Sequence, residues 1–182
     1  FKSICWQNNY RWKKISELDH GKNLAGNVQQ EFRLEKAFID KSKWGIFLSN
    51  CAKAWIKQTL NQEITKFQLI SSWIVRQFKN EYNPIHTHGG HLSGVGYLKV
   101  PKNFGKTLQS TKITNQNGML SLIHGSRTFM SESTYNIIPS VGDFYFFPNY
   151  LMHTVYPFTD THEERRSVSF NALIDDDIYN VF

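Results

Sequence analysis

The chain has little cysteine. Only Cys5 and Cys51 occur among 182 residues. They are too far apart for a metal-binding cysteine pair, and two thiols in a chain of this length make no disulfide framework. A reducing compartment is therefore expected, and we predict a cytoplasmic location.

Long apolar runs are also missing. No stretch approaches the roughly 20 residues that a membrane-spanning helix needs, and no signal peptide is recognisable. The sequence begins at Phe1 without a methionine, so a preceding segment stays open. We expect no membrane partner.

Basic residues do not form a block. Lys and Arg exceed Asp and Glu by six, which gives a pI near 9.3. The basic residues of the N-terminal half are spread in ones and twos from Lys2 to Lys79. Nucleic-acid binding needs a clustered patch, so it is not expected, whereas anionic substrates or acidic partners are compatible with the charge.

Three of the seven histidines form a pattern that can bind a metal. His86 and His88 are two residues apart in an extended stretch, and strand side chains alternate, so both imidazoles should share one face. His153 follows the apolar run 142–148, which is typical of another strand. Because imidazole is a common ligand of transition metals, we predict a metal site at His86, His88 and His153.

The remaining histidines do not form a metal-binding pattern with other residues. We expect His20, His124 and His162 to be structural, and His91 to support the metal ligands or to face the substrate.

One helix and one long strand are expected in the first half of the chain. Apolar residues recur every three or four positions in 34–61, which predicts an amphipathic helix packed on a sheet and capped by Asp40 or Ser42. Residues 64–79 alternate, with apolar side chains on both faces, as in a strand that is buried on both sides. Segment 24–34 reads as short strand or irregular structure and could wrap the domain or line a substrate entrance.

Short strands follow in quick succession. They are expected at 92–100, 119–123, 134–138, 144–147, 153–156 and 167–174, and the acidic residues 175–177 should end the core. Aromatic residues make up 15% of the chain, which suits pleated sheets. We predict a mainly β protein with helical decoration (α+β), with 1–182 as one domain, 1–63 as an N-terminal wrap and 64–174 as a barrel core.

A polar strip follows the third histidine. On a strand, Arg165, Ser167, Ser169 and Asn171 would share one face. An arginine at the head of such a strip suits a carboxylate, because its planar group can donate two parallel hydrogen bonds. A solvated strand end is the alternative for this arginine.

Four motifs in order resemble those of the Fe(II)- and 2-oxoglutarate-dependent dioxygenases, most closely a group of small bacterial and phage proteins. They span about half of the chain and are His86-x-His88, Ser93-Gly94-Val95-x-Tyr97-Leu98, Gly142-Asp143-Phe144-x-Phe146-Phe147-Pro148-x-x-x-x-His153 and Arg165-x-Ser167. The resemblance implies a double-stranded β-helix, or jelly-roll, of the cupin-like kind.

The resemblance also implies a reaction. Fe(II) would be bound by His86 and His153, and Arg165 would bind the distal carboxylate of 2-oxoglutarate, with Ser167 assisting and Tyr97 nearby. Decarboxylation of 2-oxoglutarate to succinate with O₂ would be coupled to hydroxylation of an unknown substrate, either a peptide or protein side chain or a small molecule. No catalytic residue beyond the metal site is expected, and the oligomeric state is open.

Position 88 departs from the family pattern, which usually has a carboxylate there. Three neutral imidazoles would leave the iron one charge more positive. His88 either completes a three-histidine site or turns aside and leaves two ligands. We favour ligation, because its spacing from His86 already gives it the correct direction.

Two other functions remain open. A cupin-like three-histidine metalloenzyme would need no 2-oxoglutarate, but cupins usually place a Glu ligand soon after the His pair, and 89–97 contains none. A non-catalytic binding module would use the histidines structurally and the basic surface for an acidic partner.

Overall fold

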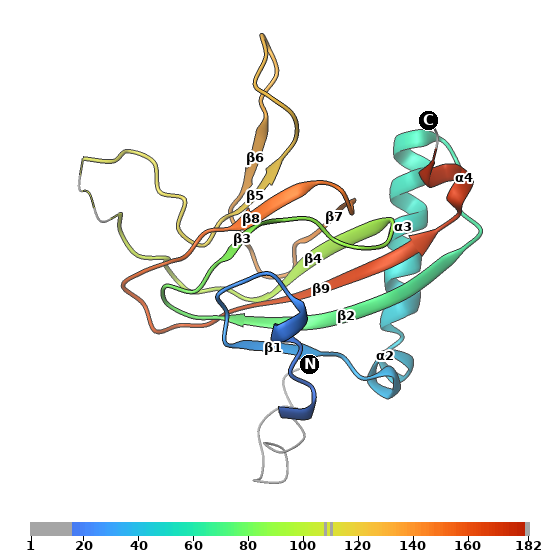
Figure 1. Ribbon diagram of the computed structural model, residues 1–182, viewed down its shortest axis with the longest axis horizontal. Coiled ribbons are helices and arrows are strands. Elements are labelled where there is room, and N and C mark those ends of the chain that lie inside the picture. The colour runs from blue at the N-terminus through green and yellow to red at the C-terminus, as the bar shows by residue number, and fades with distance from the viewer. Residues whose placement is uncertain (1–15, 108, 110, 181–182) are drawn as a thin grey trace.

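The computed structural model describes residues 16–107, 109 and 111–180, so Cys5 lies outside the described residues. It consists mainly of antiparallel strands with helices at one side (Figure 1). The expected mainly β jelly-roll with helical decoration is confirmed. Within the described ranges, no helix is both long and apolar enough to cross a membrane.

Two antiparallel sheets make up the body of the protein. The larger has the order β1-β2-β9-β4-β7, and the smaller has the order β3-β8-β5-β6. The strands of the larger sheet are β1 (Gln30–Arg33), β2 (Phe67–Gln77), β9 (Arg165–Ile174), β4 (Leu92–Lys99) and β7 (Phe144–Pro148). Those of the smaller are β3 (Asn83–His86), β8 (Met152–Val155), β5 (Leu120–Ile123) and β6 (Thr134–Ile137).

Both faces of the larger sheet are covered. On one face, Val95 and Tyr97 of β4 pack with Leu120 of β5 and Ile137 of β6, which joins the two sheets. The other face lies against α3 (Trp44–Leu60), which runs behind the sheet in Figure 1. The chain therefore has two apolar layers, and only the layer between the sheets contains the polar strip of β9.

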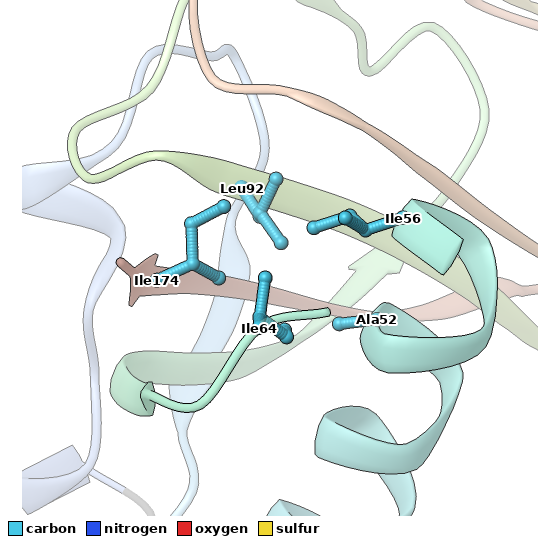
Figure 2. Close-up of a cluster of buried hydrophobic side chains, with 5 residues drawn as sticks. All are labelled: Ala52, Ile56, Ile64, Leu92 and Ile174. Atoms are coloured by element: carbon cyan, nitrogen blue, oxygen red, sulfur yellow. The ribbon is translucent and has the colours of Figure 1, made fainter. Parts of the chain in front are cut away.

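Helix α3 is held by small and branched side chains. Ala52 and Ile56 contact Ile64, Leu92 and Ile174, and Figure 2 shows the five side chains meeting between helix and sheet. All five are at most 4% exposed. The expected apolar stripe is thus confirmed as a packing surface against the sheet.

The expected helix over 34–61 is divided. A short helix, α2 (Lys36–Ser42), ends at Lys43, whose φ of 57° is left-handed, and α3 begins directly after it. The predicted cap was wrong, because neither Asp40 nor Ser42 caps α3. Asp40 accepts a hydrogen bond from Lys36 and Ser42 donates to the Ile39 carbonyl.

A register shift in β2 corrects a second expectation. The shift between Leu69 and Ser71 places Phe67 and Leu69 against the helix, whereas Trp73 and Val75 line the cavity between the sheets. The sequence pattern assigned all four to one face. A β-bulge of this kind changes which face later residues occupy.

The acidic residues 175–177 continue the fold rather than ending it. Asp175 accepts hydrogen bonds from the backbone of Thr65 and Lys66, and α4 (Asp176–Tyr179) then packs Ile178 and Tyr179 on the core. The assignment of 1–182 to one domain stays a prediction.

An ion cluster joins β2 to the start of β9. Glu164 is only 4% exposed and contacts Arg76 at 2.5 Å and Arg166 at 2.7 Å. Burial raises the pKa of the Glu164 carboxyl, but hydrogen bonds and charge from Arg166 and Arg76 outweigh burial and lower it to about 2. The cluster fixes the backbone next to Arg165.

We therefore expect Glu164→Gln to lower the free energy of unfolding at pH 7 by about 2–4 kcal/mol, since it leaves two arginines without their shared anion. The folded pKa lies below the unfolded value of 4.5, so the unfolded chain binds more protons and the stabilisation falls as the pH drops from 4.5 towards 2. Urea unfolding at several pH values measures this. Glu63→Gln, at an exposed ion pair, is the control. A loss of unfolding free energy in Glu164→Gln that equals the loss in the control, or that does not change with pH, would contradict the role of Glu164.

Candidate metal centre

The antiparallel pairing of β3 with β8 brings two distant histidines together. His86 is the direct cross-strand partner of His153, and their ring centroids are 4.2 Å apart. His88 follows β3 in a segment that is fixed by reciprocal hydrogen bonds with Asn149. The structure thus brings together the three histidines that the spacing singled out.

The three imidazoles point the same nitrogen at a common point. The Nε2 atom of His88 lies 3.2 Å from Nε2 of His86 and 3.0 Å from Nε2 of His153. The possible ligand atoms of all three lie within 4.8 Å of one another. Imidazole ligands lie about 2.0–2.1 Å from a zinc ion and similarly from related metals, so one ion can contact all three nitrogens.

The opposite nitrogen of each ring fixes its tautomer. Nδ1 of His86 lies 2.7 Å from the Pro84 carbonyl, Nδ1 of His153 lies 2.9 Å from the Leu151 carbonyl, and Nδ1 of His88 lies 2.8 Å from Asn171 Oδ1. These oxygens can only accept, so each Nδ1 carries the hydrogen. Each Nε2 then has a lone pair directed at the other two, as in histidines that bind metal and donate their second nitrogen to an acceptor.

The surroundings keep two of these imidazoles neutral. Burial is the main cause that lowers the pKa of His88 to about 4, and the neighbouring His86 adds to it. Burial, followed by the charge of His86, lowers the pKa of His153 to about 3. Trp73 stacks on His88 with ring centroids 5.6 Å apart, and Phe147 covers His153 at 4.9 Å. Neutral imidazoles are the form that binds metal.

Two cavities meet at the histidines. The inner cavity lies between the sheets and includes His153, Phe147 and the strip Arg165, Ser167 and Ser169. The outer cavity includes Asn171, Glu31 and residues 23–25. His86, His88, Trp73 and Asn83 line both. A metal at the Nε2 atoms would therefore be accessible from two sides.

The inner cavity contains a buried cation. Arg165 is 2% exposed, donates from Nη1 to Gln77 at 3.1 Å, and its Cζ lies 5.0 Å from the centre of the Tyr97 ring. Arg165 Nε and the Tyr97 hydroxyl are both buried and form no hydrogen bond of good geometry with any described residue. Burial lowers the pKa of Arg165 and raises that of Tyr97. Donors left without an acceptor in a cavity fit an anionic ligand such as a carboxylate.

The strip of β9 faces inward as its alternation predicts. Ser167 is 3% exposed and lies beside Val75 and Tyr97 on the neighbouring strands. Asn171 has a role that the sequence did not reveal: it accepts from His88 and from the Ser93 hydroxyl at 2.8 Å each. The alternation of polar residues along 165–171 predicted which face Asn171 occupies, but not that it would bind His88.

The expectation about His91 needs correction. His91 neither supports the ligands nor faces the outer cavity. It stacks on Tyr179 at 4.0 Å and accepts a hydrogen bond from the Ile174 amide. Phe144 and Phe146 pack beside Leu48 and do not line the inner cavity, where Phe147 and Trp73 are the aromatic residues.

Glu31 is a site residue that sequence reasoning missed. The sequence of 24–34 is compatible with a segment that wraps the domain or lines an entrance, and the structure places Leu24, Ala25 and Glu31 at the outer cavity. The short strand β1 reaches it by pairing with β2, where Glu31 lies opposite Val75. No local pattern distinguishes Glu31 from a solvent-exposed glutamate.

Comparisons with known proteins agree with this geometry. Residues 71–171, more than half of the chain, match the model of the 2OG-Fe(II) oxygenase family. No curated protein sequence matches the chain.

Solved structures share the fold at low identity. A prolyl-4-hydroxylase of Pseudomonas putida has a TM-score of 0.56 and 14% identity, covering 88% of this chain and 80% of that chain. The viral collagen prolyl hydroxylase of Paramecium bursaria Chlorella virus-1, in a 2OG complex, has a TM-score of 0.53 and 14% identity, covering 91% of each chain. HygX of Streptomyces hygroscopicus, with nickel and 2-oxoglutarate bound, has a TM-score of 0.50 and 13% identity, covering 91% of this chain and 78% of that chain. At these identities the likeness shows the fold alone.

In the metal-free protein we expect His88 and His153 to stay neutral, with hydrogen on Nδ1, down to about pH 5, because burial lowers their pKa values to about 4 and 3. Nitrogen NMR of the imidazoles measures both tautomer and titration. Between pH 6.5 and 4 the unfolded chain binds more protons, so the contribution of these two residues to the unfolding free energy falls as the pH falls. Hydrogen on Nε2, or titration near 6.5, would contradict the assigned geometry.

Proposed function

Because this chain belongs to the 2OG-Fe(II) oxygenase family, we propose that His86, His88 and His153 bind its Fe(II) and that Arg165 binds 2-oxoglutarate. As a member of this family it is an oxidoreductase that uses 2-oxoglutarate and O₂. The finer proposal is that the reaction hydroxylates a peptide or protein side chain or a small molecule. The single observation that most supports the proposed site is a cavity lined by three histidines whose Nε2 atoms converge and by a buried arginine that has no ion-pair partner among the described residues.

Each histidine has a defined task in this proposal. The carbonyls of Pro84 and Leu151 and the amide of Asn171 hold the rings so that Nε2 faces the metal. Fe(II), when bound, would supply the activation of O₂, which is coupled to the decarboxylation of 2-oxoglutarate. His88 replaces the carboxylate that is usual at its position, and we propose that it ligates, since its Nε2 is directed at the other two.

Arg165 provides the charge for the co-substrate. Its guanidinium is buried without an ion-pair partner in the described part of the chain, so a carboxylate can take its free donors. The Tyr97 hydroxyl has no acceptor there either, and Ser167 lies beside both. Gln77 restrains the guanidinium from the other side at 3.1 Å. A carboxylate bound at these groups would extend 2-oxoglutarate towards the histidines that line the same cavity.

Part of the wall of the inner cavity is apolar. Trp73, Phe147 and Val95 line it together with the histidines, and apolar walls strengthen the attraction between arginine and carboxylate. The prime substrate would enter by the outer cavity, which reaches His86 and His88 from the other side. Family membership and Arg165 together favour this reaction over a cupin-like enzyme without 2-oxoglutarate and over a non-catalytic module.

We expect Arg165→Met to weaken 2-oxoglutarate binding roughly 30-fold or more, because it removes the positive charge proposed to bind the distal carboxylate while keeping an unbranched side chain. Calorimetric titration of 2-oxoglutarate into protein loaded with Mn(II) measures the affinity. Arg127→Met, at an exposed arginine, is the matched control, and Mn(II) affinity should be the same in both.

The reaction itself is tested by succinate. Wild-type protein with Fe(II), 2-oxoglutarate and O₂ should release succinate slowly even without a substrate, and Arg165→Met should release much less. No succinate from the wild type, or an unchanged 2-oxoglutarate affinity in Arg165→Met, would refute the proposal.

A further inference from the structure

Glu31 is a buried carboxylate that the proposed reaction does not use. It lies on β1, is 2% exposed and lines the outer cavity next to His86 and His88. Its Oε1 is buried and has no hydrogen-bond partner among the residues that the structure describes. A buried carboxylate oxygen without a donor is costly unless a ligand provides one.

The charge near Glu31 is negative. Burial raises the pKa of Glu31 to about 7, a hydrogen bond from Asn83 opposes this, and the neighbouring acids Asp19 and Glu81 raise it further. Asp19 and Glu81 are occupied by backbone amides, those of Gly21, Gln29 and Phe78. No ion pair involving Glu31 occurs in the described ranges of this basic chain. The lining of the outer cavity thus contains Glu31, with Asp19 and Glu81 near it, whereas the lining of the inner cavity contains Arg165.

We propose that the outer cavity binds the prime substrate through a cationic nitrogen, an ammonium or a guanidinium group, which donates to Glu31 Oε1. This deepens the proposed function and rests on it, since it assigns the substrate class of the same site. A cation satisfies the free oxygen and gains from Asp19 and Glu81, whereas an anion would be repelled by all three.

Glu31 would offset the charge of the unusual metal site. Three neutral ligands leave a divalent metal with its full charge, which would repel a cationic substrate. Glu31 offers an anchor of opposite sign beside that centre, on the side away from Arg165. The carboxylates of 2-oxoglutarate and the cation of the substrate would then occupy cavities of opposite charge.

The test uses small probes with a short unbranched alkyl chain: n-butylammonium, n-butylguanidinium, n-butanol and pentanoate, each with a butyl group. Their affinities are measured by ligand-observed NMR on the full chain, once metal-free and once with Mn(II) and 2-oxoglutarate. We expect the two cations to bind about tenfold or more tighter than butanol, and pentanoate not to bind in the outer cavity. Glu31→Gln, which keeps the shape and removes the charge, should reduce the affinity for the two cations to the affinity for butanol. Glu132→Gln, at an exposed glutamate, should leave the affinity for the cations unchanged.

Cations that bind the wild type no better than butanol would overturn the proposal, and this result needs no variant. A preference that survives Glu31→Gln would overturn it equally. The 2-oxoglutarate affinity of the same samples separates the two claims. If it is normal while the cation preference is absent, only the substrate class fails. If 2-oxoglutarate does not bind while the preference depends on Glu31, the proposed co-substrate fails.

Discussion

Three imidazole lone pairs face one another where two cavities meet, and a metal cation is the partner that can satisfy all three at once. Each Nδ1–H donates to a backbone carbonyl or to the Asn171 amide oxygen. The hydrogen therefore stays on Nδ1, and no ring can offer an Nε2–H to the lone pair of its neighbour. The β3–β8 pairing that causes this also joins residues 67 positions apart, His86 and His153. Helix α3 and the outer face of the larger sheet support this arrangement from behind.

The two cavities that meet at the histidines contain buried groups of opposite charge. The inner cavity has a buried arginine with unused donors, and the outer cavity has a buried glutamate with an unused acceptor. The overall charge of +6 says nothing of this division, because both groups are hidden from solvent. Under the two proposals, 2-oxoglutarate would bind in the inner cavity and a cationic substrate in the outer one, so both could reach the same metal from different sides.

Local patterns were enough to predict most of the fold and which three histidines lie together. Short segments typical of strands located most strands from β4 to β9. The His86-x-His88 spacing predicted two imidazoles on one face, and the alternation of 165–171 predicted a polar strip headed by Arg165. Effects that depend on distant packing were not predictable. The break at Lys43 and the shift near Ile70 follow from how α3 and β2 fit the sheet. Glu31 reaches the site only because β1 adds to the edge of β2, and its local sequence contains no sign of that pairing.

The central claim is that all three histidines bind one metal. X-ray absorption of the Fe(II)-loaded protein under anaerobic conditions counts the imidazole rings around the metal directly. We predict three rings, with nitrogens at about 2.1 Å, and two rings after His88→Ala. Two rings in the wild type, with no change on replacing His88, would contradict the three-histidine centre.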